Sequence, residues 1–189
     1  MPTLAEPALA QGLSKAGYHV LGFEGVLARG CAIEPRALAD GLCIRESPIE
    51  ELELWVDIFV EGFAQPDQQG TRPAESFPKE ALRASLRVMA TTAIRMIGLD
   101  DGVAAAVGCL SLVDGVAFFN GATTLPAHRG RGLQTALIER RLQLADQRGA
   151  ELACVTTQPG SKSQQNVMRQ GFEPIYTRVL MTKSPGLAH

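Results

Sequence analysis

The sequence lacks the long apolar runs and the charge excess that mark membrane proteins and nucleic-acid-binding proteins. No run of about 18 apolar residues occurs, so no transmembrane helix is predicted. Residues 1–16 lack the basic segment and apolar run of a secretory signal. The 18 Lys and Arg are balanced by 20 Asp and Glu, for a net charge of −2 and a pI of about 5.9. We therefore expect a cytoplasmic protein with neither a membrane nor a nucleic acid as partner.

Paired metal-ligand motifs are also missing. The four cysteines, Cys31, Cys43, Cys109 and Cys154, are widely spaced, form no Cys-x-x-Cys and have no paired His. That spacing argues against a structural zinc site and favours reduced thiols. We expect no metal.

The motifs of the best-known nucleotide-binding loops are absent as well. There is no Gly-x-x-x-x-Gly-Lys-Ser/Thr, and Gly130, Gly132 and Thr135 do not complete a Gly-x-Gly-x-x-Gly. The sequence has instead a Gly- and Arg-containing loop, His128–Gln134, between a predicted strand and the predicted helix Leu133–Arg148. Helix N-termini leave backbone N–H groups without partners, and glycines let that backbone approach an anion closely. Arg129 and Arg131 add charge suited to phosphate, while a surface loop with a basic patch is the alternative.

This loop resembles a known motif. Thr124–Gln134 is similar to the acyl-CoA signature of the GNAT superfamily of N-acetyltransferases, in which a strand and a Pro-containing link precede Arg/Gln-x-x-Gly-x-Gly/Ala at a helix start. Here the motif reads Arg129-x-x-Gly132-x-Gln134, and its last position departs from the usual small residue. A second segment, Ser163–Phe172, resembles the helix and Gly-Phe pair that close many domains of this family, with Asn166 five residues before Gly171.

The order of predicted elements agrees with that resemblance. After a first strand, Gly41–Arg45, the segment Ser47–Glu50 has the pattern of a capping box and begins a helix that runs to about Phe63. A polar loop over Ala64–Glu75 and a helix over Pro78–Met89 follow. Glu50, Glu53, Asp57 and Glu61 form an acidic row on the first helix, which we interpret as a solvated face. The alternative is that some of these acids face the acceptor cleft, which this helix flanks in the GNAT folds that the sequence resembles.

Three antiparallel strands come next, and a crossover completes the domain. Strands over 93–99, 103–113 and 116–125 are joined by two Asp-Gly turns, a hairpin signal. The helix Leu133–Arg148 then leads to an apolar strand, Leu152–Thr157, which suits a buried parallel position. A short helix capped by Ser161 or Ser163 and a last strand, Phe172–Thr182, close the chain. The fold class is therefore α/β (α+β), with a GNAT-like, mixed and mostly antiparallel central sheet flanked by helices.

The first 38 residues are predicted to be an extension to a domain over residues 39–183, with a tail at 184–189. A helix over 3–16 and a strand over Tyr18–Leu27 echo the end of the chain, since Lys15–Tyr18 parallels Arg169–Phe172. The extension resembles the last helix and strand of a second GNAT-like half. It could be a relic of one or part of a longer chain, and chance similarity is the alternative.

The resemblance implies acetyl-CoA as co-substrate and a set of residues that hold it. Its pantetheine arm would pair with the strand before the loop, its pyrophosphate would rest on backbone N–H groups, and His128 would lie near phosphate. The implied cofactor-binding residues are Ala122, Thr123, Thr124, Leu125, Arg129, Gly130, Arg131, Gly132, Leu133, Gln134, Thr135 and Asn166.

The sequence departs from the family where catalysis is concerned. Many members carry a Tyr acid four residues before the closing Gly, where this chain has Val167, and a Glu base on the third strand, where it has Phe118–Asn120. Tyr176 and Asn120 are the remaining catalytic candidates, although a packed strand residue with its hydroxyl at the edge is the better interpretation of Tyr176.

Three functions remain open at this point. The first is transfer of an acetyl group from acetyl-CoA to a primary amine of a small molecule, by direct attack in a ternary complex, in a monomer or homodimer. The second is a non-catalytic acyl-CoA-binding sensor or regulatory module, which the missing Tyr and Glu favour. The third is a different nucleotide-binding α/β domain.

Overall fold

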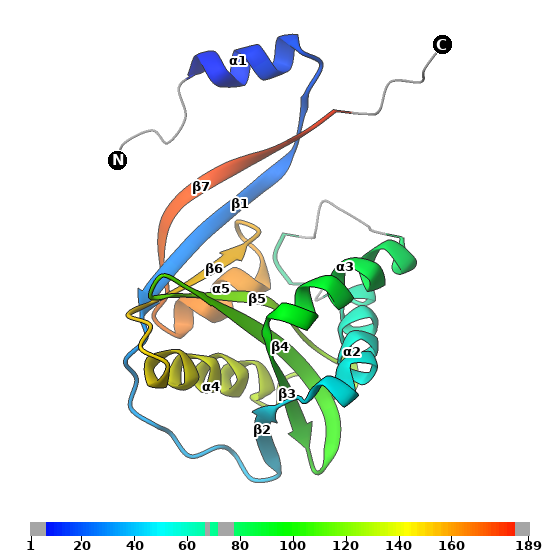
Figure 1. Ribbon diagram of the computed structural model, residues 1–189, viewed down its shortest axis with the longest axis vertical. Helices are drawn as coiled ribbons and strands as arrows, with labels where there is room; N and C mark the ends of the chain where they lie inside the picture. Colours follow the sequence, from blue (N-terminus) through cyan, green and yellow to red (C-terminus); the bar gives the residue numbers. More distant parts are fainter. Residues whose placement is uncertain (1–6, 67–68, 72–77, 184–189) are drawn as a thin grey trace.

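The computed structural model describes residues 7–66, 69–71 and 78–183 of the 189-residue chain (Figure 1). The predicted tail, the first residues of the predicted N-terminal helix and half of the predicted loop Ala64–Glu75 lie outside these ranges. The elements in chain order are α1 (Pro7–Lys15), β1 (His19–Gly30), β2 (Leu42–Glu46), the 3-10 turn η1 (Ile49–Glu51), α2 (Leu52–Ala64), α3 (Lys79–Thr92), β3 (Ile94–Asp100), β4 (Val103–Val113), β5 (Val116–Thr124), the 3-10 turn η2 (Pro126–His128), α4 (Leu133–Gln147), β6 (Leu152–Thr157), α5 (Lys162–Arg169) and β7 (Glu173–Thr182).

One seven-stranded sheet has the order β2-β3-β4-β5-β6-β1-β7. Every neighbouring pair is antiparallel except β5 and β6, which are parallel from Val116 and Leu152 to Phe119 and Val155. Both Asp-Gly hairpin predictions are confirmed, since Asp101, Gly102, Asp114 and Gly115 all have positive φ, as a type I′ turn requires. The predicted mixed, mostly antiparallel sheet flanked by helices is confirmed.

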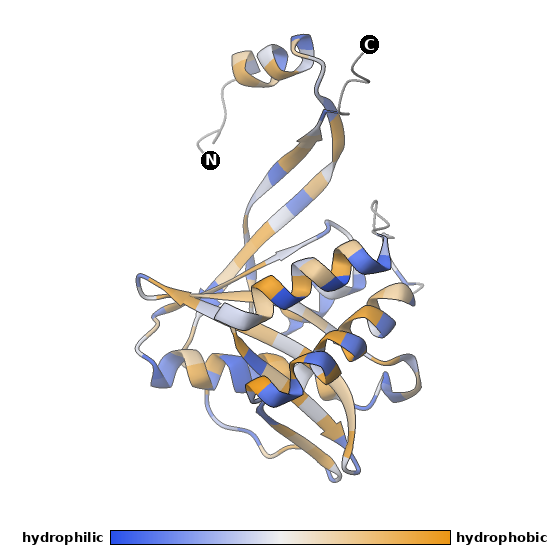
Figure 2. Cartoon of the chain, turned by 45° about the vertical axis from the view of Figure 1, so that its right-hand side comes forward, coloured by the Kyte–Doolittle hydropathy of each residue, from blue (hydrophilic) through white to orange (hydrophobic). Residues whose placement is uncertain are grey.

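Helices cover both faces of the sheet and create two apolar layers (Figures 1 and 2). On one face, α4 packs Leu137, Ile138 and Leu142 against the sheet, within a cluster that also holds Phe119 and Phe172. On the other face, α2 and α3 contribute a cluster centred on Trp55, whose Nε1 donates to the carbonyl of Met96 at 3.1 Å. In Figure 2 the helices carry hydrophilic residues along their outer sides, which is the amphipathic pattern of a layered fold.

The predicted capping box at Ser47 is wrong. The Ser47 hydroxyl lies 3.1 Å from the Glu51 carboxylate, and no side chain caps the turn that begins at Ile49. The same carboxylate accepts from both terminal nitrogens of Arg45, at 2.7 and 2.8 Å. Because this two-bond ion pair draws Glu51 toward β2, the chain forms a 3-10 turn first and α2 begins only at Leu52. At the other predicted cap, Ser161 accepts from the Gln164 N–H at 3.1 Å, as expected.

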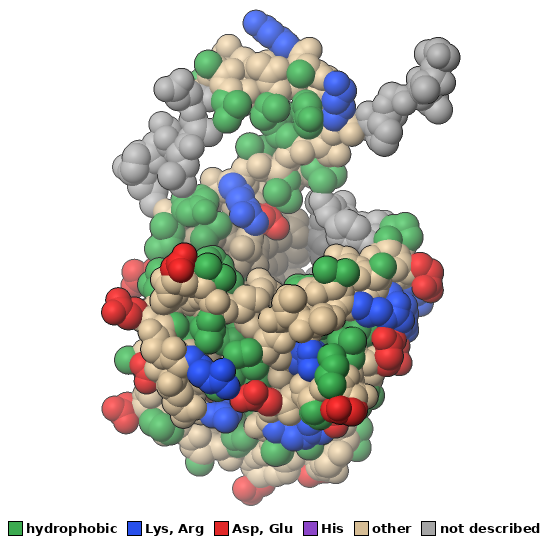
Figure 3. All heavy atoms as spheres, viewed as in Figure 1, with side chains coloured by type: hydrophobic (Ala, Val, Ile, Leu, Met, Phe, Trp, Pro, Cys, Tyr) green, Lys and Arg blue, Asp and Glu red, His purple; other side chains and the backbone are tan. Residues whose placement is uncertain are grey.

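The strand of the N-terminal extension lies inside the sheet. β1 pairs with β6 through residues 25–30 and with β7 through residues 19–28. Beyond β6, residues 19–24 of β1 and 178–182 of β7 continue as a two-stranded arm that carries α1 (Figure 1). No residue of α1 is buried. Figure 3 shows hydrophobic side chains gathered on α1 and the arm, whereas charges of both signs are mixed over the body.

The sequence echo has a structural counterpart. α1 and α5 are each followed by a glycine with positive φ, +86° at Gly17 and +81° at Gly171, and then by β1 and β7, which are antiparallel neighbours. Glu24 and Arg178 form an ion pair at 2.6 Å across this strand pair. The two helix–strand units thus share the order helix, glycine, strand, and their strands run antiparallel to each other. Their origin in a second acetyltransferase-like half, and the division of the chain at residue 38, stay predictions.

The first testable prediction concerns the close approach of α2 to β5. A Cβ added to Gly62 would lie 2.3 Å from Thr123 Oγ1 and 2.9 Å from its Cγ2. Gly62→Ala should therefore destabilise the protein by about 1–3 kcal/mol in chemical denaturation, although Ala is favoured over Gly in a helix by about 1 kcal/mol. Gly12→Ala in α1, where nothing lies within 4 Å, is the control and should cause no loss. Rescue of Gly62→Ala by Thr123→Ala would confirm the cause, and an unchanged Gly62→Ala midpoint would disprove it.

The second prediction concerns the thiols. Burial raises the pKa of Cys109 to about 11. Burial also raises the pKa of Cys154, and burial together with the charge of Asp146 raises the pKa of Cys31. Since the thiolate is the reactive form, these three thiols should react slowly with a disulfide reagent at pH 8. Cys43 is exposed on β2. We expect one fast equivalent in the native protein, four after denaturation, and loss of the fast equivalent in Cys43→Ser. Two or more fast equivalents would contradict the burial of the others.

Candidate functional site

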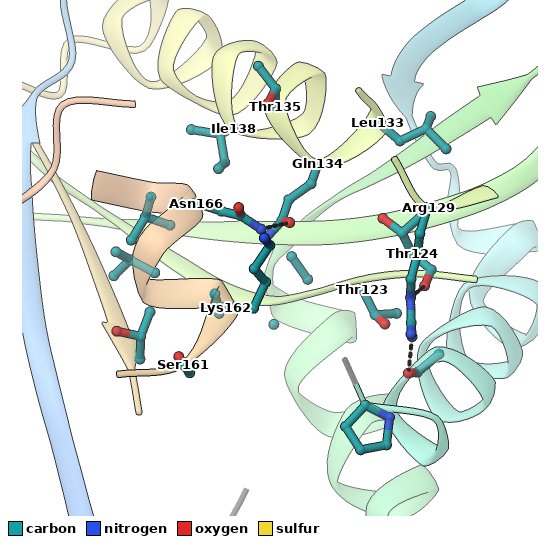
Figure 4. A pocket seen from close by; sticks show the side chains of 18 of the residues that line it. Thr123, Thr124, Arg129, Leu133, Gln134, Thr135, Ile138, Ser161, Lys162 and Asn166 are labelled. Atoms are coloured by element: carbon teal, nitrogen blue, oxygen red, sulfur yellow. Dashed lines mark hydrogen bonds between the residues drawn. The ribbon is translucent and has the colours of Figure 1, made fainter. Parts of the chain in front are cut away.

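A cavity of about 660 Å³ opens where β5 and β6 separate (Figure 4). The two strands stop pairing after Phe119 and Val155. The following residues, 121–124 of β5 and 156–157 of β6, line its walls together with the C-terminal part of α2, the start of α4 and α5. The gap is thus a wedge between two parallel strands, closed at one end by their last hydrogen-bonded pair.

A bulge in β5 produces this separation. The register between β4 and β5 shifts so that Gly108 faces Ala122 while Cys109 faces Asn120, which leaves Gly121 as an extra residue. Gly121 has a φ of +39°, and a Cβ there would lie 2.6 Å from the Phe59 ring. A bulge bends its strand and increases its twist, so β5 turns away from β6 at this point. Only glycine fits, because both the φ and the contact with Phe59 exclude a side chain.

The loop between β5 and α4 leads from the cavity to the N-terminus of α4. After η2, Gly130 and Gly132 take positive φ, and Gly132 is the N-cap of α4 with no side-chain cap. The first N–H groups of this 15-residue helix are therefore left for a partner from outside the helix. Together with the positive end of the helix dipole, they form an anion site at one end of the wedge.

The two loop arginines are held by protein acceptors. The Arg129 side chain donates to the carbonyl of Thr124 at 3.1 Å, to that of Gly62 at 3.2 Å and to that of Gln65 (Figure 4). It therefore ties the loop to the C-terminal end of α2. Arg131 lies 2.7 Å from Asp100 Oδ2. Both side chains are thus engaged within the protein, and contact of either residue with a phosphate, through side chain or backbone N–H, stays a prediction.

Asp100 fixes the loop between β5 and α4 through two side-chain contacts. This carboxylate is 1% exposed, and its Oδ2 accepts from His128 Nδ1 at 2.6 Å as well as from Arg131. The other oxygen, Oδ1, is buried with no partner among the described residues. Because Asp100 ends β3 and begins the Asp-Gly turn, the hairpin and the loop are fixed to each other. The sequence pattern assigned Asp100 only to a turn, so its contacts with the loop were not predicted.

The far wall is formed by α5. Asn166 donates through Nδ2 to Gln134 Oε1 and accepts from Arg169 at 3.2 Å (Figure 4). The structure thus brings together two predicted site residues that are 32 positions apart. Thr157 also lines the cavity, and its buried hydroxyl has no partner among the described residues. It is a hydrogen-bonding group that a ligand could satisfy.

Arg141 forms part of the cavity floor and was not predicted. It is 4% exposed, donates to the carbonyls of Leu137 at 3.1 Å and Cys109 at 3.3 Å, and lies 4.5 Å over the Phe119 ring. Burial lowers the pKa of Arg141 to about 10. The available signal was its place on α4, one turn after Leu137 on the apolar stripe, where a charged residue is unusual.

Most, but not all, of the predicted site residues line the cavity. Those that do are Ala122, Thr123, Thr124, Arg129, Gly130, Gly132, Leu133, Gln134, Thr135 and Asn166. Leu125 and Arg131 adjoin it without being part of its lining. Asn120 donates to Ser111 Oγ at 3.1 Å and Tyr176 lies on β7, and neither lines the cavity. Among the described lining residues there is no Asp or Glu, whereas Arg129, Arg141 and Lys162 are present.

Comparisons with solved structures identify the fold. A GCN5-related N-acetyltransferase from Kribbella flavida superimposes with a TM-score of 0.68 at 23% identity, over 97% of this chain and 66% of its own. The corresponding protein from Sphaerobacter thermophilus gives 0.66 at 16% identity, over 94% and 56%. A tandem GNAT protein from the clavulanic acid biosynthesis pathway gives 0.62 at 17% identity, over 95% and 58%. The chain therefore spans about three fifths of the length of these proteins.

A search of curated protein sequences found no match. The comparison with protein families did find a match. Residues 53–172, which run from α2 through the wedge and the loop to the Gly-Phe pair, match the model of the acetyltransferase (GNAT) family. Because this match covers more than half of the sequence, and because the sheet order and loop geometry agree with it, the chain belongs to the acetyltransferase (GNAT) family.

Proposed function

We propose that this chain transfers an acetyl group from acetyl-CoA to a primary amine of a small molecule by direct attack in a ternary complex. The observation that carries the proposal is the wedge between β5 and β6, which leads to the uncapped N-terminus of α4. One feature offers backbone hydrogen bonds along a strand, and the other offers an anion site. An elongated ligand with a diphosphate at one end and amides along its length matches both.

In this proposal each part of acetyl-CoA has its own partners. The pyrophosphate rests on the N–H groups of residues 130–135, and the pantetheine amides pair with the free edge of β5 at residues 121–124. The Thr157 hydroxyl and the Gln134–Asn166 pair face the arm from the other side. This arrangement adds a strand-like segment to an open sheet edge. The thioester then lies at the closed end of the wedge, near the bulge at Gly121.

The chemistry at that end relies on positioning. The amine nitrogen forms a bond to the acetyl carbon, the carbonyl oxygen gains charge, and a backbone N–H of the separated part of β5 can stabilise it. No described lining residue is a carboxylate that could act as base, so the amine proton leaves through water. The same absence argues against an acceptor with several positive charges. Phe59 and Phe63 give the acceptor end an apolar wall.

A non-catalytic acyl-CoA sensor is the second candidate. It is favoured by the buried Val167 where the resemblance implies a Tyr acid, and by the lack of a carboxylate among the described lining residues. A cytoplasmic location and a monomeric or homodimeric state stay predictions of the sequence.

A CoA-release assay over a panel of small primary amines separates the two candidates. Turnover with at least one amine, absent without protein and saturable in acetyl-CoA, supports the acetyltransferase. Saturable acetyl-CoA binding in calorimetry without release of CoA from any amine supports the sensor. Absence of acetyl-CoA binding would disprove both.

The binding geometry predicts an unusual pair of effects for Gln134→Glu. The new carboxylate lies in the first turn of α4, where it interacts favourably with the helix dipole by about 0.3–1 kcal/mol, so the melting temperature should be unchanged or raised. The same charge lies beside the proposed pyrophosphate, so the dissociation constant of acetyl-CoA should rise about tenfold or more, an effect that added salt weakens.

Gln143→Glu is the matched control, since it makes the same change on the same helix away from the cavity lining. It should leave acetyl-CoA binding within about twofold of the wild type. Equal affinity of the two variants in calorimetry would mean that the phosphates do not lie at the start of α4.

A further inference from the structure

The Arg141 guanidinium is a buried positive charge without a negative partner. Of its five N–H groups, one on Nε and one on Nη1 donate to backbone carbonyls, and the others have no partner among the described residues. The ion pairs found in the described part of the chain do not include it. The nearest compensation is the Phe119 ring at 4.5 Å.

Such a group is costly to keep unless something compensates for it. A buried charge without a counter-charge destabilises the fold, and replacement by an apolar residue is often neutral or stabilising. Burial lowers the pKa of Arg141 to about 10, so the side chain still carries its charge near pH 7. Because Arg141 also lines the cavity, its uncompensated charge is available to an anion that arrives with a ligand.

The position of Arg141 indicates which part of the ligand would carry this anion. Eight residues separate Leu133 from Arg141 on α4, which is about 12 Å of helix away from the pyrophosphate loop. On β5, Thr124 and Phe119 are five residues apart, which is about 17 Å of strand. Both elements therefore lead from the loop to the point where Arg141 lies over Phe119. There β5 and β6 make their last pair and the wedge closes.

We propose that Arg141 is a catalytic residue that stabilises the CoA thiolate as it leaves. This inference rests on the proposed function, because it places the acyl end of acetyl-CoA at the closed end of the wedge. The amine nitrogen uses its lone pair to form the N–C bond, and the carbonyl π electrons move to oxygen. When the carbonyl forms again, the C–S bond breaks and its electron pair leaves on sulfur. The ammonium proton passes to water, and the thiolate sulfur, now negative, pairs with the Arg141 guanidinium.

The structure also explains why such a residue is needed. Val167 is 4% exposed and apolar, so it cannot donate a proton to sulfur from the position where the family resemblance implies a Tyr. A fixed cation lowers the energy of a thiolate without transferring a proton, which is an electrostatic alternative to a general acid. An electrostatic role also fits the absence of acidic side chains from the described lining, because a neighbouring carboxylate would neutralise the guanidinium.

The test is the pKa of the thiol of CoA bound to the protein, measured from thiolate absorbance across a pH series. Subtracting the spectrum of a complex with desulfo-CoA removes the contribution of the protein's own cysteines. In the wild-type complex the thiol pKa should be lower than that of free CoA in the same buffer by at least about one unit, a tenfold shift in thiolate population. Arg141→Met should abolish this shift, and Arg141→Lys should keep part of it.

Arg140→Met is the matched control, because it removes a neighbouring charge of the same helix that does not line the cavity, and it should leave the shift intact. Desulfo-CoA affinity should be similar in the wild type and in Arg141→Met. An equal loss of CoA and desulfo-CoA affinity would instead assign Arg141 to the phosphates and overturn the proposal.

The wild-type measurement alone is decisive if Arg141→Met does not fold. A bound thiol whose pKa equals or exceeds that of free CoA overturns the role of Arg141 while leaving CoA binding intact. Failure of the wild type to bind either CoA or desulfo-CoA would instead disprove the proposed function. A lowered thiol pKa that persists in a folded Arg141→Met also overturns the inference, since the shift would then have another source.

Discussion

The end of the hydrogen-bond ladder between β5 and β6 is the constraint on which the candidate site depends. The two strands are held together only from Val116 and Leu152 to Phe119 and Val155. Beyond that point the bulge at Gly121 turns β5 away, and Phe59 of α2 occupies the space that a side chain at Gly121 would need. Without this interruption the sheet would be continuous and there would be no wedge between β5 and β6. The free edge of β5, the walls of the cavity and the approach to α4 all follow from it.

In the loop between β5 and α4, charged side chains and backbone N–H groups have different roles. The Asp100 carboxylate binds His128 and Arg131, and carbonyls at the end of α2 accept hydrogen bonds from Arg129. The charged side chains therefore fix the loop, while the N–H groups at the start of α4 are left for a ligand. This arrangement is pre-organised, because the loop does not have to be rebuilt when an anion arrives.

Local sequence signals predicted the elements, and a family resemblance predicted their assembly. The Asp-Gly turns, the strand–helix–strand crossover and the Ser161 cap depend on residues close together in sequence, and each is confirmed. The resemblance carried by Arg129–Gln134 and by Gly171-Phe172 pointed to the family that the match over residues 53–172 establishes.

What could not be predicted depends on partners far away in the chain. The capping box of Ser47 and Glu50 failed because the Ser47 hydroxyl bonds instead to the Glu51 carboxylate, which Arg45 holds through an ion pair that no spacing rule anticipates. The partners of Arg129 and Arg131 within the protein were not predicted, because the sequence does not show that carbonyls of α2 and the carboxylate of Asp100 lie within reach. Arg141 was missed because only the folded sheet reveals that its side of α4 is covered by Phe119 and Cys109.

The insertion of β1 between β6 and β7 also has a consequence for how the chain folds. Gly30 pairs with Leu152 and His19 with Thr182, so an early strand depends on partners from the other end of the chain. During synthesis the apolar residues of β1 lack their strand partners until β6 and β7 have been made. Such distant pairings close large loops and slow folding, and an unpaired apolar strand is prone to associate with other chains. β1 thus becomes native only after β6 and β7, which follow it far along the chain, are in place.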